Sequence, residues 1–243
     1  MRGPKARSPG RLERNDPAMY DELADQWWRP RGKFAMLHWL AAARAELVPP
    51  ASRPDAVLVD LGCGAGLLAP HLAGKGYRHI GVDLSLNALR QGAEHGVQGV
   101  RADVLAVPLA DGCADVVAAG EILEHVADLR GAVSEACRLL RPGGLLVIDT
   151  LAATALCRWL AIGLAERVPR MAPRGVHDPA LLVDRAVLFA ECARHGVVLS
   201  LRGIRPSMTD LLLWTVRRRE AVRMLPVPTT AVLFQAWGRK RSR

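Results

Sequence analysis

The sequence predicts an α/β fold that is doubly wound around a mostly parallel sheet. From residue 56 onward, short apolar runs alternate with stretches of helical pattern, which is typical of strand–helix–strand units. The runs lack polar alternation, as do strands that are buried on both faces of a parallel sheet. The predicted strands lie at residues 56–60, 79–83, 99–103, 114–119 and 145–150, and the predicted helices among them at 67–74, 86–95 and 129–140.

The N-terminal residues are predicted to form a helical cap on this core. Residues 17–28 and 33–47 carry helical patterning, and the breaker Arg29-Pro30-Arg31-Gly32 separates them. The basic residues 1–15 are predicted to be a disordered tail. The helical cap therefore spans residues 16–50.

The pattern changes after residue 150. Residues 151–178 are apolar but interrupted by arginines, and we expect them to form an inserted amphipathic lid segment. Helices are predicted at 179–195 and 211–224. Two β-prone runs, at 197–202 and 229–237, could pair at the edge of the sheet, which would then have seven strands.

The length fits a single domain, which we place at residues 16–238 with a core at 56–150 and a basic tail at 239–243. The chain has 33 basic and 24 acidic residues, for a net charge of +9. Many of the basic residues lie in the two ends, so the body is close to neutral, which argues against a nucleic-acid-binding face. Five cysteines without C-x-x-C spacing fit neither a disulfide framework nor a zinc site, and no signal-type or membrane-spanning apolar run is visible. We therefore expect a soluble, cytoplasmic protein.

A glycine-rich turn follows the first predicted strand. Gly62, Gly64 and Gly66 occupy alternate positions before a helix, where glycines let the backbone approach a ligand and the helix N-terminus offers free N–H groups. Asp83 ends the second strand, at the sheet edge where an acid can accept hydrogen bonds from ribose hydroxyls. This spacing predicts a nucleotide-cofactor site.

The glycine spacing also distinguishes between cofactors. A dinucleotide fingerprint reads G-x-G-x-x-G, whereas this turn reads G-x-G-x-G and is not followed by a basic residue for a pyrophosphate. Asp60, just before the glycines, would repel a pyrophosphate but suits a ligand with a cationic amine. An adenosine cofactor with a cationic amino-acid tail therefore fits better than NAD.

Several motifs of this chain resemble those of class I S-adenosylmethionine-dependent methyltransferases. They are VDLGCGAG at 59–66, GVD at 81–83, RAD at 101–103, EILEHV at 121–126 and LLRPGG at 139–144. Outside the core, the sequence resembles the N-terminal signature and the insertion of the ubiquinone-biosynthesis O-methyltransferase family, at Ala24-x-x-Trp27-Trp28, Gly32-x-Phe34, Leu37-His38, Arg44 and residues 158–178. The resemblance implies a Rossmann-like methyltransferase fold and S-adenosylmethionine as the cofactor.

The resemblance also implies individual roles at the cofactor. Arg44, Gly62, Asp83 and Gly120 would contact S-adenosylmethionine, with the Arg44 guanidinium paired to the methionyl carboxylate. Asp103 would either lie near the adenine amine or simply end its strand. The full set of expected cofactor-binding residues is Arg44, Asp60, Gly62, Gly64, Gly66, Asp83, Leu84, Asp103 and Gly120.

Ionisable residues follow the fourth predicted strand, beside the expected sulfonium. Methyl transfer to a phenol requires a deprotonated oxygen, and His125 is the predicted base because histidine titrates near neutral pH. Glu121 and Glu124 would place the substrate. Alternatively, Glu121, Glu124 and His125 would hold a divalent cation such as Mg²⁺ that lowers the pKa of a catechol, which the resemblance favours. If no metal binds, the glutamate of the Glu-His-Val motif, Glu124, would instead cap a helix.

The predicted function is S-adenosylmethionine-dependent O-methylation of a phenol or catechol, with a polyprenylated quinone precursor as one option. Residues 151–174, with Trp159 beside Arg158, are predicted either to touch the inner membrane face peripherally or to form a lid packed over the site. Two alternatives stay open. One is a methyltransferase for a soluble small-molecule acceptor, and the other is a non-catalytic protein that binds the cofactor.

Overall fold

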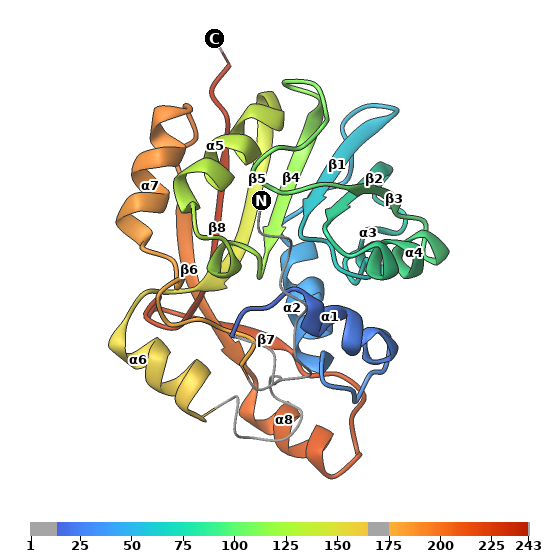
Figure 1. Cartoon of the computed structure of the whole chain (residues 1–243), viewed down its shortest axis with the longest axis vertical. Helices are drawn as coiled ribbons and strands as arrows, with labels where there is room; N and C mark the ends of the chain where they lie inside the picture. Colours follow the sequence, from blue (N-terminus) through green and yellow to red (C-terminus); the bar gives the residue numbers. More distant parts are fainter. Residues whose placement is uncertain (1–13, 165–174, 243) are drawn as a thin grey trace, which may run out of the picture.

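The parallel half of the sheet matches the predicted strands. In the computed structural model, which describes residues 14–164 and 175–242, eight strands form one sheet in the order β3-β2-β1-β4-β5-β8-β6-β7. The first five strands along the chain are parallel to one another. They are β1 (Ala56–Leu61), β2 (Tyr77–Asp83), β3 (Gln98–Arg101), β4 (Ala114–Gly120) and β5 (Leu140–Leu151) (Figure 1). The predicted α/β fold is confirmed.

The other half of the sheet is antiparallel and has one strand more than predicted. β8 (Leu233–Arg239) pairs with β5, and β6 (Ser200–Pro206) pairs with β8, as the two β-prone runs suggested. β7 (Met224–Val227) then adds an eighth strand at the edge. The helix predicted at 211–224 is wrong in its second half, since α8 covers only Met208–Thr215. The proline in β7 obscured the strand, but an edge strand tolerates proline.

Apolar side chains cover both faces of β1, which explains its lack of polar alternation. Val57, Val59 and Leu61 belong to the cluster that also contains residues of α5 (Leu129–Leu139) and α7 (Arg185–Arg194). Leu58 belongs to the opposite cluster, to which α2 (Ala35–Ala45), α3 (Ala69–Leu72) and α4 (Leu86–Glu94) contribute. Two buried layers therefore flank the sheet and fix its strands in place.

Residues at both ends of the described range make contacts with the rest of the fold. The first predicted helix is divided into α1 (Ala18–Glu22) and the short η1 (Ala24–Gln26). Ahead of them, the Asn15 backbone N–H donates to the carbonyl of Gly175 at 3.0 Å, so the expectation of disorder up to residue 15 is wrong there. At the other end, Arg239 ends β8, and the Lys240 ammonium donates to two backbone carbonyls of the α5–β5 junction.

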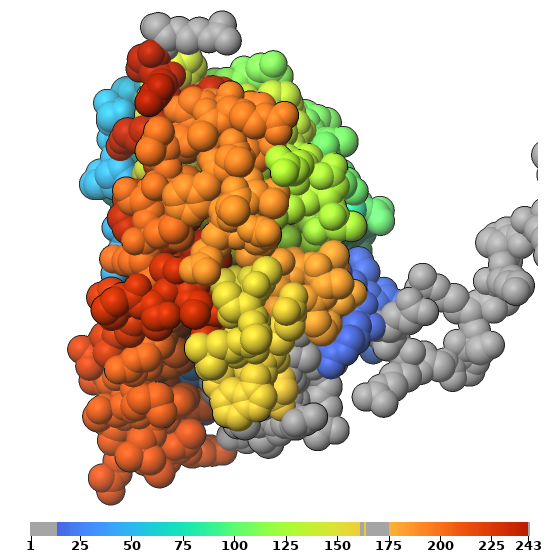
Figure 2. All heavy atoms as spheres, turned by 90° about the vertical axis from the view of Figure 1, so that its left-hand side faces the viewer, coloured from blue at the N-terminus to red at the C-terminus, as the bar shows by residue number. Residues whose placement is uncertain are grey.

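The predicted lid segment is only partly described. After β5 come α6 (Ala155–Cys157) and the π-helical η3 (Arg158–Leu164), and residues 165–174 lie outside the described range. Figure 2 shows α6 and η3 at the lower end of the molecule, below the surface of α7. Among the described residues, no helix combines the length and apolarity that crossing a membrane requires.

Candidate functional site

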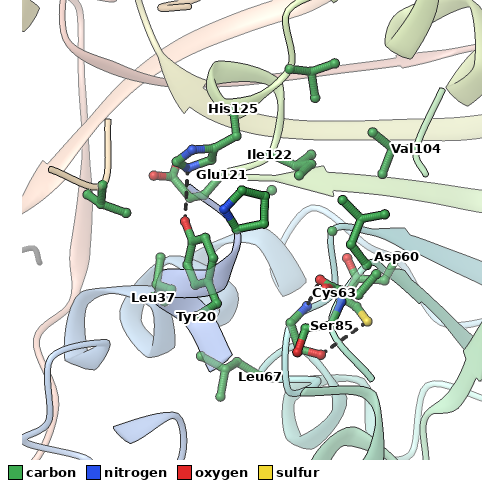
Figure 3. Close-up of a pocket in the computed structure, with 18 of the residues that line it drawn as sticks. Tyr20, Leu37, Asp60, Cys63, Leu67, Ser85, Val104, Glu121, Ile122 and His125 are labelled. Atoms are coloured by element: carbon green, nitrogen blue, oxygen red, sulfur yellow. Dashed lines mark hydrogen bonds between the residues drawn. The ribbon is translucent and has the colours of Figure 1, made fainter. Parts of the chain in front are cut away.

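A cavity of about 590 Å³ opens at the carboxyl ends of β1, β2 and β4. The N-terminal helices form its opposite wall (Figure 1). Figure 3 shows Tyr20 and His125 pointing toward each other at one end, while Asp60, Cys63 and Ser85 gather at the other. We call these the acceptor end and the cofactor end. Eight of the nine predicted cofactor residues line the cavity.

The glycine turn at the cofactor end has no room for side chains. Gly62 and Gly64 both have positive φ, at 65° and 52°. A Cβ on Gly62 would lie 2.6 Å from Ile122, and one on Gly64 would lie 2.6 Å from the ring of Trp27. Gly66 is the predicted residue outside the cavity lining, since it faces Val97 and α4 instead. Its glycine is explained by helix packing.

Two carboxylates flank this turn. Asp83 accepts hydrogen bonds from the backbone N–H groups of Gly64 and Ser85, both at 2.8 Å, and burial raises its pKa above the usual value. Asp60 is buried between its strand neighbours in β2 and β4, with Oδ2 3.4 Å from Nε2 of His79. The turn is thus held in shape by the same Asp83 carboxylate that faces the cavity.

Leu84 and Asp103 line the far side of the cofactor end. Leu84 is half exposed, and Asp103 lies near the start of the loop after β3, where its carboxylate accepts the Leu105 N–H at 2.9 Å. Both residues therefore border the same cavity as Asp83.

Arg44 reaches the centre of the cavity from α2 and is paired with a residue that the sequence analysis missed. Its Nε and Nη2 donate to the two carboxylate oxygens of Asp149 at 2.5 and 3.1 Å, and both side chains are buried. Burial alone would lower the pKa of Arg44, but Asp149, together with Asp60 and Glu121, raises it above the ordinary value. The guanidinium lies over Gly120, where a Cβ would come within 1.7 Å of it. The two contacts to Asp149 use Nε and Nη2 and do not involve Nη1.

The acidic residues after β4 occupy two different places. Glu121 lines the cavity with a positive φ of 52°, and its N–H donates to the Asp149 carbonyl. Glu124 is fully buried behind the lining and accepts the Thr150 hydroxyl at 2.7 Å. One carboxylate oxygen of each has no hydrogen-bond partner among the described residues. Burial raises the pKa of both.

The structure groups His125 with Glu124 and His177, and not with Glu121. One potential ligand atom of each of the three lies within 4.8 Å of the others. The rings of His125 and His177 stack with centroids 5.5 Å apart. His177 is far from His125 in the sequence, so motif spacing could not predict that the two rings meet. The sequence feature that could have pointed to His177 is its place in residues 158–178, the segment that resembles the insertion of the family.

His125 is a half-buried imidazole whose pKa is lowered. Desolvation, and then the neighbouring His177, lower its pKa to about 3. Its Nε2 lies 3.4 Å from the hydroxyl of Tyr20, which belongs to an aromatic stack with Trp27 and Phe34. Across the physiological pH range the ring therefore accepts hydrogen bonds or protons, beside an apolar aromatic wall.

Comparison of the sequence with known proteins shows which family this chain belongs to. A model of the methyltransferase domain matches residues 59–148. Ubiquinone biosynthesis O-methyltransferases from Thiobacillus denitrificans and Ralstonia nicotianae are 36% and 37% identical to this chain over 187 and 195 residues, which are 74% and 76% of this chain and 80% of each relative.

Solved structures agree on the fold. A SAM-dependent methyltransferase from Thermotoga maritima superposes with a TM-score of 0.66 at 17% identity, covering 92% of this chain and 99% of that one. A geranyl diphosphate C-methyltransferase from Streptomyces coelicolor, solved with Mg²⁺, geranyl diphosphate and S-adenosyl-L-homocysteine, gives 0.57 at 20% identity, covering 94% and 90%. The sequence likeness and the fold together show that this chain is an S-adenosylmethionine-dependent methyltransferase and belongs to the family of the ubiquinone biosynthesis O-methyltransferases.

Proposed function

We propose that this enzyme methylates a phenolic oxygen of a quinone precursor. The observation that carries the proposal is a single cavity that joins the cofactor end to the half-buried imidazole of His125, whose pKa is lowered. The names of the relatives supply the reaction class, and the aromatic wall of Tyr20, Trp27 and Phe34 suits a flat aromatic acceptor. We propose that this acceptor carries a polyprenyl tail.

At the cofactor end, each residue has one task. Asp83 takes the ribose hydroxyls, and Asp103 takes the adenine amine beside Leu84. Nη1 of Arg44 takes the methionyl carboxylate, while Asp60 faces the cationic amine and sulfonium side. Gly62, Gly64 and Gly120 let the ligand approach the backbone closely. Alignment of sulfur, methyl carbon and phenolic oxygen then supplies much of the rate enhancement.

At the acceptor end, the proton leaves through His125. Nε2 takes the phenolic proton as the oxygen attacks the methyl carbon. The carbon–sulfur bond breaks, and its electron pair returns to sulfur. A base with a pKa of about 3 is weak, so this step requires an acceptor of lowered pKa or a transfer that is concerted with the attack.

The residues around His125 fit a divalent cation. Glu124 has a fully buried carboxylate oxygen without a partner among the described residues, and two imidazoles lie beside it. One carboxylate and two imidazoles suit Mn²⁺ or Zn²⁺ better than Mg²⁺, which prefers oxygen ligands. When bound there, such an ion would acidify a catechol. Glu124, His125 and His177 would hold it, in place of the Glu121, Glu124 and His125 set predicted from the sequence.

A panel of acceptors tests the proposal. Purified enzyme is incubated with labelled S-adenosylmethionine and with catechols that carry or lack an isoprenoid tail, and products are identified by mass spectrometry. We expect labelled methyl ether on the catechols and none on matched compounds whose hydroxyls are blocked. Transfer to an amine or a carbon acceptor, with none to any phenol, would overturn the O-methyltransferase proposal.

We further propose that the lower end of the molecule touches an anionic membrane surface. Trp159 is 65% exposed and Leu156 47%, beside Arg158. α8 lies at the same end and exposes Met208 and Leu212 (Figure 1). Apolar side chains mixed with arginines are typical of interfacial elements.

Flotation with liposomes that contain anionic lipid tests this contact. The double variant Leu156→Ser/Trp159→Ser should lose most of the binding. Val198→Ser, a change at another exposed apolar residue, 62% exposed and following α7, should keep it. Equal binding by both variants would contradict the proposal.

A further inference from the structure

Asn15 connects the N-terminal segment directly to the ring of His125. Its Nδ2 lies 2.9 Å from the backbone carbonyl oxygen of His125, and its Oδ1 lies 2.5 Å from Nδ1 of the same residue. Both contacts span 110 positions of the sequence. One amide side chain therefore touches the backbone and the ring of a single partner.

These two contacts determine where the protons are. A backbone carbonyl can only accept, so the amide atom facing it must be the NH₂ group, and Oδ1 must be the atom that faces the ring. Oδ1 can only accept, so the ring nitrogen opposite it must be the donor. Nδ1 of His125 therefore carries the proton, and Nε2 carries the lone pair.

The lone pair faces the cavity. The Tyr20 hydroxyl, 3.4 Å away, is the group that can donate to Nε2, and it lies in the lining of the cavity together with His125. This is a phenol donating to the imidazole, which is the contact that a phenolic acceptor would make. The opposite tautomer would present an N–H group to the acceptor and could not receive its proton.

The backbone conformation and the hydrogen bonds of the N-terminal segment hold the Asn15 side chain against His125. Its backbone is left-handed, with φ of 60°, a conformation that asparagine tolerates better than most residues. Its N–H donates to the Gly175 carbonyl, and Arg14 donates to the His177 carbonyl at 2.6 Å. The N-terminal segment is thus fastened to the segment that contains His177.

From this geometry we propose that Asn15 is a positioning residue, which fixes His125 in the Nδ1–H tautomer so that Nε2 can receive a proton or a cation. The inference deepens the proposed function and rests on it for the role of His125. It holds for both chemistries considered above, because a metal-binding histidine also needs a partner for its other ring nitrogen.

Two variants of Asn15 and one control test the proposal. Asn15→Gly removes the amide and suits the left-handed backbone, whereas Asn15→Asp keeps an acceptor opposite Nδ1. The control is Asn87→Ala, a change at an exposed asparagine that lies outside the cavity lining and does not contact His125. The readouts are the ring-nitrogen resonances of His125 in ¹⁵N-histidine-labelled protein, kcat with a catechol acceptor, and the Kd of S-adenosylmethionine by calorimetry.

We expect Nδ1–H in the wild type, in Asn15→Asp and in Asn87→Ala, and a mixture of tautomers in Asn15→Gly. Asn15→Gly should lower kcat about 10- to 100-fold, as loss of such a partner of a ring nitrogen does, without changing the cofactor Kd. Asn15→Asp keeps the acceptor opposite Nδ1 but loses the donor to the His125 carbonyl, so its loss of kcat should be smaller than that of Asn15→Gly. Asn87→Ala should keep the wild-type kcat.

A wild-type ring that carries its proton on Nε2 would overturn the inference, as would an unchanged ring signature in Asn15→Gly. Loss of kcat in Asn15→Asp equal to that in Asn15→Gly would also overturn it, because the acceptor opposite Nδ1 would then be irrelevant. If no phenol is methylated by the wild type, the proposed function fails. The resonances still decide the tautomer in that case.

Discussion

The two ends of the cavity are built in different ways. The cofactor end comes from the turn after β1 and from the ends of neighbouring parallel strands, with backbone N–H groups held by Asp83. The acceptor end comes from separate segments that meet only in the folded chain: the N-terminal segment, the residues after β4, and the segment of His177. Burial raises the pKa of Glu121 and lowers that of His125 at this end.

This contrast separates two functions. The glycine turn and Asp83 at the cofactor end form a local motif, to which Trp27 and Arg44 are added from the N-terminal helices. The chemistry at the acceptor depends on burial and on partners from far along the chain. Changes at one end should therefore alter affinity for S-adenosylmethionine, and changes at the other should alter turnover.

The sharpest test of this separation is His125→Asn. If the imidazole is the proton or cation acceptor, its loss should lower kcat by about 10²- to 10⁴-fold. The Kd of S-adenosylmethionine should change less than threefold. Single-turnover kinetics and calorimetry measure the two quantities, and a variant with wild-type turnover at every pH would remove His125 from the mechanism.

Breaking the buried pair between the two ends should mainly affect stability. Asp149→Asn leaves the Arg44 guanidinium buried without its carboxylate, and we expect a loss of about 3–5 kcal/mol in the free energy of unfolding. Urea denaturation measures it. Asp111→Asn, which removes an exposed acid paired with Arg138, is the control and should cost under about 1 kcal/mol. Equal losses in the two variants would contradict this account of the pair.

At the cofactor end, Asp83→Ala should weaken S-adenosylmethionine binding by about 100-fold or more, since hydrogen bonds to a charged group contribute about 1.5–3 kcal/mol each. Calorimetry measures the Kd. Asp111→Ala, which removes an exposed acid outside the cavity lining, is the control and should keep the wild-type Kd. Near-normal affinity in Asp83→Ala would remove the assigned cofactor site.

The smallest expected effect is a pH dependence of stability at the acceptor end. The pKa of His125 is about 3 in the folded protein and about 6.5 when unfolded, so between these values the unfolded chain binds more protons. Its contribution to stability is therefore complete above pH 6.5 and falls as the pH drops, by up to about 1.4 kcal/mol per pH unit.

Glu121 and Glu124, with raised pKa values, contribute slopes of the opposite sign. The informative quantity is therefore the difference between wild type and His125→Asn in urea denaturation at pH 4.5 to 7.5. The wild type should lose stability more steeply toward low pH. If the two plots of stability against pH are parallel, the pKa of His125 is not lowered in the folded protein.

Most of the fold and the cofactor end could be predicted from the sequence. The apolar runs and the glycine turn are local signals, and parallel strands bring their carboxyl ends to one edge, so Asp83 and the turn had to meet. The eighth strand was missed because Pro226 at a sheet edge looks like a loop. Gly66 shares the motif with Gly62 and Gly64, but helix packing takes it away from the cavity.

The sequence by itself determined the sheet, the glycine turn and the cofactor class, because these depend on short-range pattern and on the direction of parallel strands. Only the tertiary structure decided that Asp149 pairs with Arg44 across 105 positions, that His177 joins Glu124 and His125, and that Asn15 reaches the imidazole. Such contacts are set by how packed layers bring distant segments together, and burial there changes the pKa of each group in ways that residue type alone does not indicate.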